Sequence, residues 1–197
     1  GISVSDLARL DGVIPAYPRA LEILDYAEKH EDEFDPSRIG LVMFTSGTSG
    51  TPKATQLSWA NLIGSANAAN AALTKPGRGV WQLVLPMCHI GGFQVMMRSL
   101  LNENVFVLYS RYQPTRVLND ALTYKVTHIS VVDKILSDLI EHDNDKIISQ
   151  YSCILLGGAA LNDKTIRKAL RAKAKIFASY GMTETSSMIA CAPISRG

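Results

Sequence analysis

Short apolar runs alternate with longer stretches of helical periodicity over most of the chain, and this alternation is the feature that most restricts the fold. The apolar runs, rich in β-branched and aromatic residues as buried strands are, cover residues 80–85, 104–109, 126–132 and 153–156. Helical patterns cover residues 58–73, 92–101, 114–123, 133–141 and 162–172. Strands that are apolar throughout indicate parallel pairing with helices on both faces. The sequence therefore predicts an α/β fold built on a mainly parallel sheet.

Composition restricts the class of protein further. With 197 residues, 47% of them apolar, and a net charge of +2, the chain can bury a real core and does not resemble a disordered protein. No run reaches the roughly 20 apolar residues of a membrane span, and the first residues lack a signal-peptide pattern. Three widely spaced cysteines in no metal-ligand pattern favour a reducing compartment. We therefore expect a cytoplasmic protein without a membrane span.

Charge is distributed unevenly along the chain. Basic residues between positions 164 and 175 recur at helical spacing, which predicts one solvated helix face. No aromatic residues are interleaved to stack on bases, so we expect no nucleic-acid partner. Residues 1–38 are predicted to form a helical or irregular segment to which no role is assigned. The oligomeric state is left open.

A run rich in glycine and hydroxyl residues follows the apolar segment 39–44, as a loop at the end of a strand would. The run is Thr45-Ser46-Gly47-Thr48-Ser49-Gly50-Thr51-Pro52-Lys53. Glycines let backbone N–H groups turn toward a ligand, and N–H groups with hydroxyls form an anion-binding concavity to which Lys53 adds charge. The run is not a Walker A loop, because it lacks the sequence Gly-Lys-Ser/Thr at the required spacing. A flexible surface linker is the alternative, but the closing Pro52-Lys53 favours a phosphate-binding loop.

The segment Tyr180-Gly181-Met182-Thr183-Glu184-Thr185 is the second candidate. A tyrosine before a glycine can lay its ring on a purine, while Thr183 can donate to a phosphate and Glu184 offers a hard oxygen ligand for Mg²⁺. Taken alone, Thr183 to Thr185 are equally well explained as a helix cap or turn.

Two glycine pairs complete the candidate site. Gly157-Gly158 follows a predicted strand, where a tight strand-to-helix turn is the alternative interpretation. His89 precedes Gly91 and Gly92 at the start of a predicted helix, where an anion can bind and where missing side chains leave room for a ring. The run 45–53, the pair at 157–158 and the pair at 180–181 are all expected in loops at the carboxyl ends of strands, which is where ligands bind in such sheets.

The run 45–53 and the segment 180–185 resemble, residue for residue, two motifs of the adenylate-forming superfamily, which includes acyl- and aryl-CoA synthetases, luciferases and peptide-synthetase adenylation domains. The resemblance implies that Thr183 contacts the α-phosphate of ATP, Glu184 binds Mg²⁺ and Tyr180 stacks on adenine. It implies catalytic roles for Lys53, Thr183 and Glu184. It assigns the nucleotide to Thr45, Ser46, Gly47, Thr48, Ser49, Gly50, Lys53, Gly157, Gly158, Ala159, Ser179, Tyr180, Gly181 and Thr183, and the acid substrate to His89, Gly91, Gly92 and Ser186.

Within the superfamily, residues 83–92, 127–139 and 180–186 resemble the o-succinylbenzoate–CoA ligases of menaquinone synthesis. The implied activity is activation of a carboxylic acid by ATP and transfer of the acyl group to coenzyme A. Another aryl- or fatty-acyl-CoA ligase and a non-catalytic nucleotide-binding module are the alternatives. Residues 39–197 would form the nucleotide- and acyl-binding part of the large domain. The family's ribose-binding aspartate and its C-terminal domain with the catalytic lysine are absent, so we expect the 197 residues alone to be inactive.

Overall fold

The computed structural model describes residues 34–45, 52–74 and 79–195. The chain divides into two compact units, Gly1–Pro36 and Ser37–Gly197, and the second carries every element discussed below. Residues 1–33 of the predicted N-terminal segment and Ser46–Gly50 of the predicted phosphate loop lie outside the described residues.

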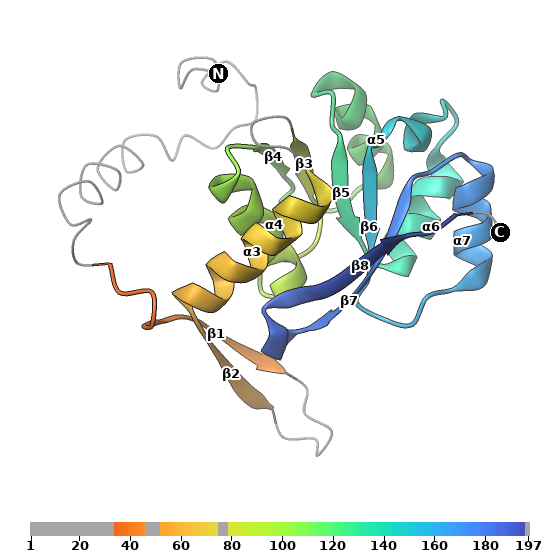
Figure 1. Ribbon diagram of the computed structural model, residues 1–197. Helices are drawn as coiled ribbons and strands as arrows, with labels where there is room; N and C mark the ends of the chain where they lie inside the picture. Colours follow the sequence, from red (N-terminus) through yellow and green to blue (C-terminus); the bar gives the residue numbers. More distant parts are fainter. Residues whose placement is uncertain (1–33, 46–51, 75–78, 196–197) are drawn as a thin grey trace. The chain divides into compact units, whose positions relative to one another are not determined.

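A six-stranded sheet forms the centre of the second unit (Figure 1). Its strands are β3 (Val80–Leu83), β4 (Val105–Leu108), β5 (His128–Val131), β6 (Cys153–Leu156), β7 (Ile176–Met182) and β8 (Ser187–Pro193). They lie in the order β4-β3-β5-β6-β7-β8, and only β8 pairs antiparallel to its neighbour. The prediction of an α/β fold with a mainly parallel sheet is therefore confirmed.

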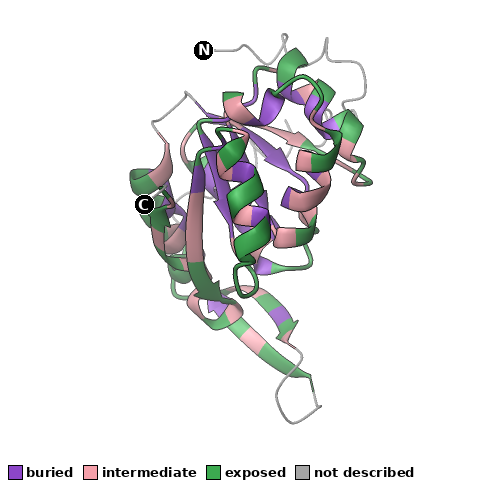
Figure 2. Cartoon of the chain, turned by 90° about the vertical axis from the view of Figure 1, so that its right-hand side faces the viewer, coloured by how far each residue is buried: buried purple, intermediate pink, exposed green. Residues whose placement is uncertain are grey.

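Helices cover both faces of this sheet. The helices are α3 (Trp59–Leu73), α4 (Ile90–Leu101), α5 (Pro114–Thr123), α6 (Asp133–His142) and α7 (Asp163–Arg171). Val117 of α5, Leu136 of α6 and Ala169 of α7 share one core cluster with the strands, whereas Val95 of α4 packs on Trp81 on the other side. Figure 2 shows the buried strands between helices whose outer surfaces are exposed. Among the described residues, no helix is both long and apolar enough to span a membrane.

Local sequence explains where several helices begin. The Ser58 hydroxyl accepts from the Asn61 N–H, and the Asn162 side chain accepts from the N–H groups of Lys164 and Thr165, which satisfies donors that a helix start leaves free. Pro114 occupies the first turn of α5, where its missing N–H costs nothing. These starts agree with the sequence predictions.

A separate antiparallel hairpin carries the predicted phosphate loop. Strands β1 (Ile39–Thr45) and β2 (Lys53–Ser58) pair with each other, and Met43 and Leu57 pack on α3 and α4. The predicted strand at 39–44 is confirmed, but the expectation that it belongs to the parallel sheet is wrong. The strands on either side of the run pair antiparallel to each other.

The β7–β8 hairpin departs from the prediction in a second way. Tyr180 and Gly181 were expected in a loop, but both belong to β7, with a register shift between them opposite β8. A Cβ on Gly181 would lie 2.6 Å from the carbonyl carbon of Ser187 and 2.8 Å from the Cα of Met188, so only glycine permits this pairing. The turn interpretation of Thr183–Thr185 is correct, because these residues form a short 3-10 helix between the strands.

Strand order locates the ligand-binding edge. Strand β3 lies between β4 and β5, so the chain leaves β3 toward one side of the sheet and later returns to pair on the other. The connections after such neighbouring strands diverge and open a crevice at the carboxyl ends, which is the usual ligand site of open α/β sheets.

Candidate functional site

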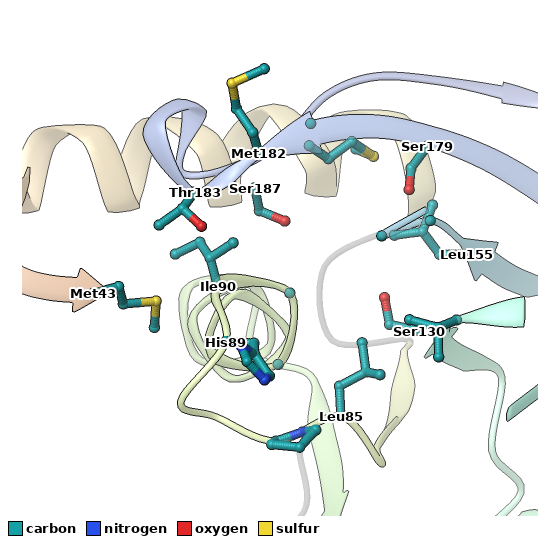
Figure 3. A pocket seen from close by; sticks show the side chains of 18 of the residues that line it. Met43, Leu85, His89, Ile90, Ser130, Leu155, Ser179, Met182, Thr183 and Ser187 are labelled. Carbon is teal, nitrogen blue, oxygen red and sulfur yellow. The ribbon is translucent and has the colours of Figure 1, made fainter. Parts of the chain in front are cut away.

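A cavity of about 430 Å³ opens at this edge (Figure 3). Its walls come from the segment that follows β3, the carboxyl ends of β5 and β6, the β7–β8 hairpin and the end of β1. Segments far apart in sequence thus converge on one space of the size that holds a small molecule.

The structure brings together about half of the residues that the sequence assigned to the site. Those that line the cavity are His89, Gly91, Gly92, Gly157, Gly158, Ser179, Gly181 and Thr183. Those that the structure describes but that do not line it are Thr45, Lys53, Ala159, Tyr180, Glu184 and Ser186. Tyr180 is 62% exposed, and Lys53 and Glu184 are also exposed.

The N-terminus of α4 forms one wall. His89 is the N-cap residue, in extended conformation, and its carbonyl accepts from the N–H groups of Gly92 and Phe93. The position between a strand and a helix start is therefore as predicted. The free N–H groups of a first turn carry a partial positive charge that favours an anion.

The two glycines of this turn serve different needs. A Cβ on Gly92 would lie 2.6 Å from the carbonyl oxygen of Leu85, so this glycine permits close backbone packing. A Cβ on Gly91 would meet only the Leu85 Cδ1 at 3.6 Å, an ordinary contact. The expectation that both glycines leave room for a ring is therefore corrected for Gly92.

The glycine pair after β6 turns the chain at the opposite wall. Gly158 has a positive φ of 86°, and a Cβ there would also approach the Val132 side chain. The Gly157 N–H donates to the Val131 carbonyl, and Ser179 donates to the Leu156 carbonyl at 3.1 Å. The pair therefore lines the cavity, and it opens a six-residue connection between β6 and α7 instead of the tight strand-to-helix turn given as the alternative.

Ser186 holds the β7–β8 turn and does not line the cavity. Its φ of 55° is left-handed, its hydroxyl accepts from the Gln94 amide at 2.9 Å, and its carbonyl accepts from the Ser65 hydroxyl at 2.6 Å. The expectation of a substrate-lining role is corrected. Ser186 ties the turn that carries Thr183 to helices α3 and α4.

Arg98 is the main residue that sequence reasoning missed. The residue lines the cavity although it is only 2% exposed, and its Nη1 has no hydrogen-bond partner among the described residues. Its Nε donates to the Gln94 carbonyl at 3.0 Å, and its guanidinium lies over the Trp81 ring, 4.8 Å from the centroid. Burial lowers the pKa of Arg98 to about 10, which still leaves it charged at neutral pH.

No carboxylate of the described residues neutralises Arg98. The ion pairs of that part of the chain join Arg116 to Asp120, Lys134 to Asp138 and Arg167 to Asp163. A buried charge without a counterion is strongly unfavourable, so an anionic ligand at this wall would relieve the imbalance. An arginine within the apolar stretch 95–101 of a predicted helix is the signal that could have identified it.

Ser130 was also missed. It is the next-to-last residue of the buried strand β5, it is 5% exposed, and its side chain points toward the cavity in Figure 3. Its hydroxyl adds a hydrogen-bond donor to the lining of the cavity.

The residues fit only one kind of magnesium site. Among the described residues, no group of three metal-binding side chains exists. Mg²⁺ keeps several waters and takes its remaining ligands from substrate phosphates and one or two carboxylates. Glu184, next to the cavity-lining Thr183, fits that arrangement and no protein-only cage.

Fold and cavity together define an α/β protein with a small-molecule site at the switch point of its sheet. The chain belongs to the family of AMP-binding enzymes, which matches residues 5–196. Similar proteins include the 2-succinylbenzoate–CoA ligases of Bacillus pumilus, 32% identical over 90% of this chain and 37% of the relative, and Staphylococcus epidermidis, 34% identical over 83% of this chain and 35% of the relative. The chain thus spans about a third of the length of these relatives.

Solved structures of related enzymes are similar to this chain in fold. The o-succinylbenzoate coenzyme A synthetase (MenE) of Bacillus subtilis in complex with ATP and magnesium ion has a TM-score of 0.75 and 31% identity, over 81% of this chain and 33% of that one. The same enzyme in complex with the acyl-adenylate intermediate OSB-AMP has a TM-score of 0.75 and 31% identity, with the same coverage. A putative long-chain-fatty-acid CoA ligase from Rhodopseudomonas palustris shares the fold, with a TM-score of 0.74 at 19% identity over 81% of this chain and 40% of that one.

Proposed function

We propose that this chain forms part of an ATP-dependent acid–CoA ligase whose acid substrate is o-succinylbenzoate, in the cytoplasm and in menaquinone synthesis. One observation carries the choice of acid. Arg98 lines the cavity, and its buried guanidinium has no carboxylate partner among the described residues. An acid that carries a second carboxylate would neutralise it, and a plain fatty acid would not. The names of the relatives support the same substrate.

ATP and coenzyme A would be the co-substrates. The N–H groups and hydroxyls of residues 45–50 with Lys53 would hold the β- and γ-phosphates. Thr183 would donate to the α-phosphate, while Tyr180 would stack on adenine beside Gly157, Gly158, Ala159, Ser179 and Gly181. When bound at Glu184, Mg²⁺ would neutralise charge on the phosphates.

The first step joins the acid to AMP. A carboxylate oxygen attacks the α-phosphorus of ATP, the bond to the bridging oxygen breaks, and pyrophosphate leaves with the electron pair. The protein contributes by placing the two reactants and by donating to the oxygens on which charge develops. His89 and the first turn of α4 lie where they can orient the reacting carboxylate, with Arg98 farther along the same helix for the second one.

The second step transfers the acyl group. The coenzyme A thiolate attacks the acyl carbon of the adenylate, the bond to the phosphate oxygen breaks, and AMP leaves. The exposed side of the adenylate must be open to the thiol, and the 430 Å³ cavity is too small to enclose coenzyme A as well.

Pyrophosphate release by the full-length enzyme, the complete product of the reading frame that encodes this chain, tests the proposal. Four acids are compared: o-succinylbenzoate, 4-oxo-4-phenylbutanoate, which lacks only the ring carboxylate, benzoate and a medium-chain fatty acid. We expect kcat/KM for o-succinylbenzoate to exceed that for 4-oxo-4-phenylbutanoate on the order of 100-fold or more, because the analogue leaves Arg98 unpaired.

Two other results would replace the proposal. A preference for benzoate or the fatty acid would assign a different acyl-CoA ligase. ATP binding without pyrophosphate release from any acid would favour a nucleotide-binding module.

A further inference from the structure

Three side chains form a stack behind the cavity wall. Trp81 of β3 and His128 of β5 are register partners on neighbouring parallel strands, with ring centroids 4.8 Å apart and planes inclined by 28°. The Arg98 guanidinium from α4 lies over the same indole at 4.8 Å. Trp81 is fully buried, so this stack lies away from solvent.

Hydrogen bonds hold the imidazole of His128 in place. Its Nε2 lies 3.0 Å from the Leu73 carbonyl, which can only accept, so Nε2 carries the proton. Its Nδ1 lies 2.6 Å from the Thr127 hydroxyl, which also lies 3.2 Å from the Val80 carbonyl. The imidazole therefore packs against the indole and is tied to the end of α3. Burial lowers the pKa of His128, so Arg98 contributes the cation of the stack.

Arg98 itself has few other restraints. Its Nε–H···O bond to Gln94 lies within its own helix, one turn back, and Nη1 has no partner among the described residues. A guanidinium on a flexible stem loses conformational freedom when it binds a carboxylate, unless another group already holds its plane. The indole face is the group from another element that does so here.

We propose that Trp81 is a positioning residue for the second carboxylate of the substrate: its indole, held in place by His128, keeps the Arg98 guanidinium oriented at the cavity wall before substrate arrives. This inference rests on the proposed function. It predicts that Trp81, which does not line the cavity, governs affinity for the acid more than the rate of the chemical step.

The test compares Trp81→Leu with Tyr151→Leu in the full-length enzyme. Tyr151 is the matched control, because it is also a buried aromatic residue but belongs to the core cluster on the other face of the sheet. We expect Trp81→Leu to raise KM for o-succinylbenzoate on the order of tenfold, with kcat and KM for ATP nearly unchanged. KM for 4-oxo-4-phenylbutanoate should not move, and Tyr151→Leu should lower stability alone.

A purely structural role gives a different pattern. Equal effects of Trp81→Leu on both acids and on ATP, or effects matched by Tyr151→Leu, would overturn the inference. If Trp81→Leu does not fold, Trp81→Phe carries the test, since phenylalanine keeps a ring that attracts cations less strongly. A rise in KM of about two- to threefold for o-succinylbenzoate alone supports the inference, and an unchanged KM overturns it.

Arg98→Lys separates this inference from the proposed function. If the wild-type enzyme does not prefer o-succinylbenzoate to 4-oxo-4-phenylbutanoate, the proposed function fails. If that preference exists and Arg98→Lys abolishes it while the Trp81 variants leave it intact, only the positioning role of Trp81 fails.

Discussion

The two helical layers of the sheet bury different chemistry. Helices α5, α6 and α7 cover an apolar cluster in which the buried polar side chain of Gln82 is hydrogen-bonded to Tyr109, Tyr151 and the Val117 carbonyl. We call this side the core layer. Helices α3 and α4 with the β1–β2 hairpin form the site layer. It buries Asn70, Gln94 and Arg98, each with a polar atom that has no hydrogen-bond partner within the described part of the chain.

This difference indicates that the core layer supplies most of the stability and the site layer most of the function. Satisfied polar groups in an apolar cluster contribute to folding, whereas unpaired buried groups cost free energy and persist where a ligand uses them. Substitutions in the core layer should therefore lower stability at constant activity per folded molecule. Substitutions in the site layer should lower activity and leave stability nearly constant.

The largest expected effect is on activity. Lys53→Ala in the full-length enzyme should lower kcat for pyrophosphate release by about 100- to 1000-fold, because one oriented cation on the leaving phosphates is lost. Lys53 is exposed at the start of β2, so the melting temperature should hardly change. Lys164→Ala, an exposed lysine of α7, is the control and should leave both quantities unchanged. Unfolding with intact specific activity would refute a phosphate role for Lys53.

Leu136→Ala should give the opposite pattern. Leu136 is fully buried in the core layer, and its truncation leaves a cavity that lowers the free energy of unfolding by about 3 kcal/mol. Urea denaturation measures the loss, and kcat/KM per folded molecule should stay constant. A drop in kcat/KM as large as that of Lys53→Ala would remove the distinction between the layers.

Tyr151→Phe tests the polar network of the core layer. The variant leaves the Gln82 Oε1 without its donor in a fully buried place, which should destabilise the protein by about 1–2 kcal/mol. Chemical denaturation of the variant and the wild type measures the difference. An unchanged free energy of unfolding would mean that a water molecule replaces the hydroxyl as the donor to Gln82, and therefore that water enters the core layer.

A smaller effect concerns pH. Burial lowers the pKa of His128 in the folded protein, the nearby Arg98 charge lowers it further, and the hydrogen bond to Leu73 opposes both. The unfolded chain then binds the proton more readily, so stability is complete above the unfolded pKa of about 6.5 and is lost as pH falls below it. His128→Gln, which keeps a donor for Leu73, should flatten this dependence in denaturation curves from pH 7 to 5. An equal change of stability with pH in both proteins would mean that other groups cause the pH dependence.

The sequence predicted the elements whose pattern is local. The strands β3 to β6 consist mostly of apolar residues, and helix starts such as Ser58 and Asn162 carry their own caps. The strands β2, β7 and β8 were missed because polar and apolar residues mix in them. Arg98 was missed because its contact with Trp81 is made between two elements that only the folded chain brings together.

The central claim is that the site layer keeps Arg98 unpaired for an anionic substrate at the expense of stability. Thermal unfolding of the wild type and of Arg98→Met, each with and without o-succinylbenzoate, tests it most directly. Methionine fills much of the same volume without the buried charge, so the account predicts that Arg98→Met unfolds at an equal or higher temperature and that only the wild type is stabilised by the acid. A lower unfolding temperature for Arg98→Met, together with an undiminished shift on adding the acid, would contradict it.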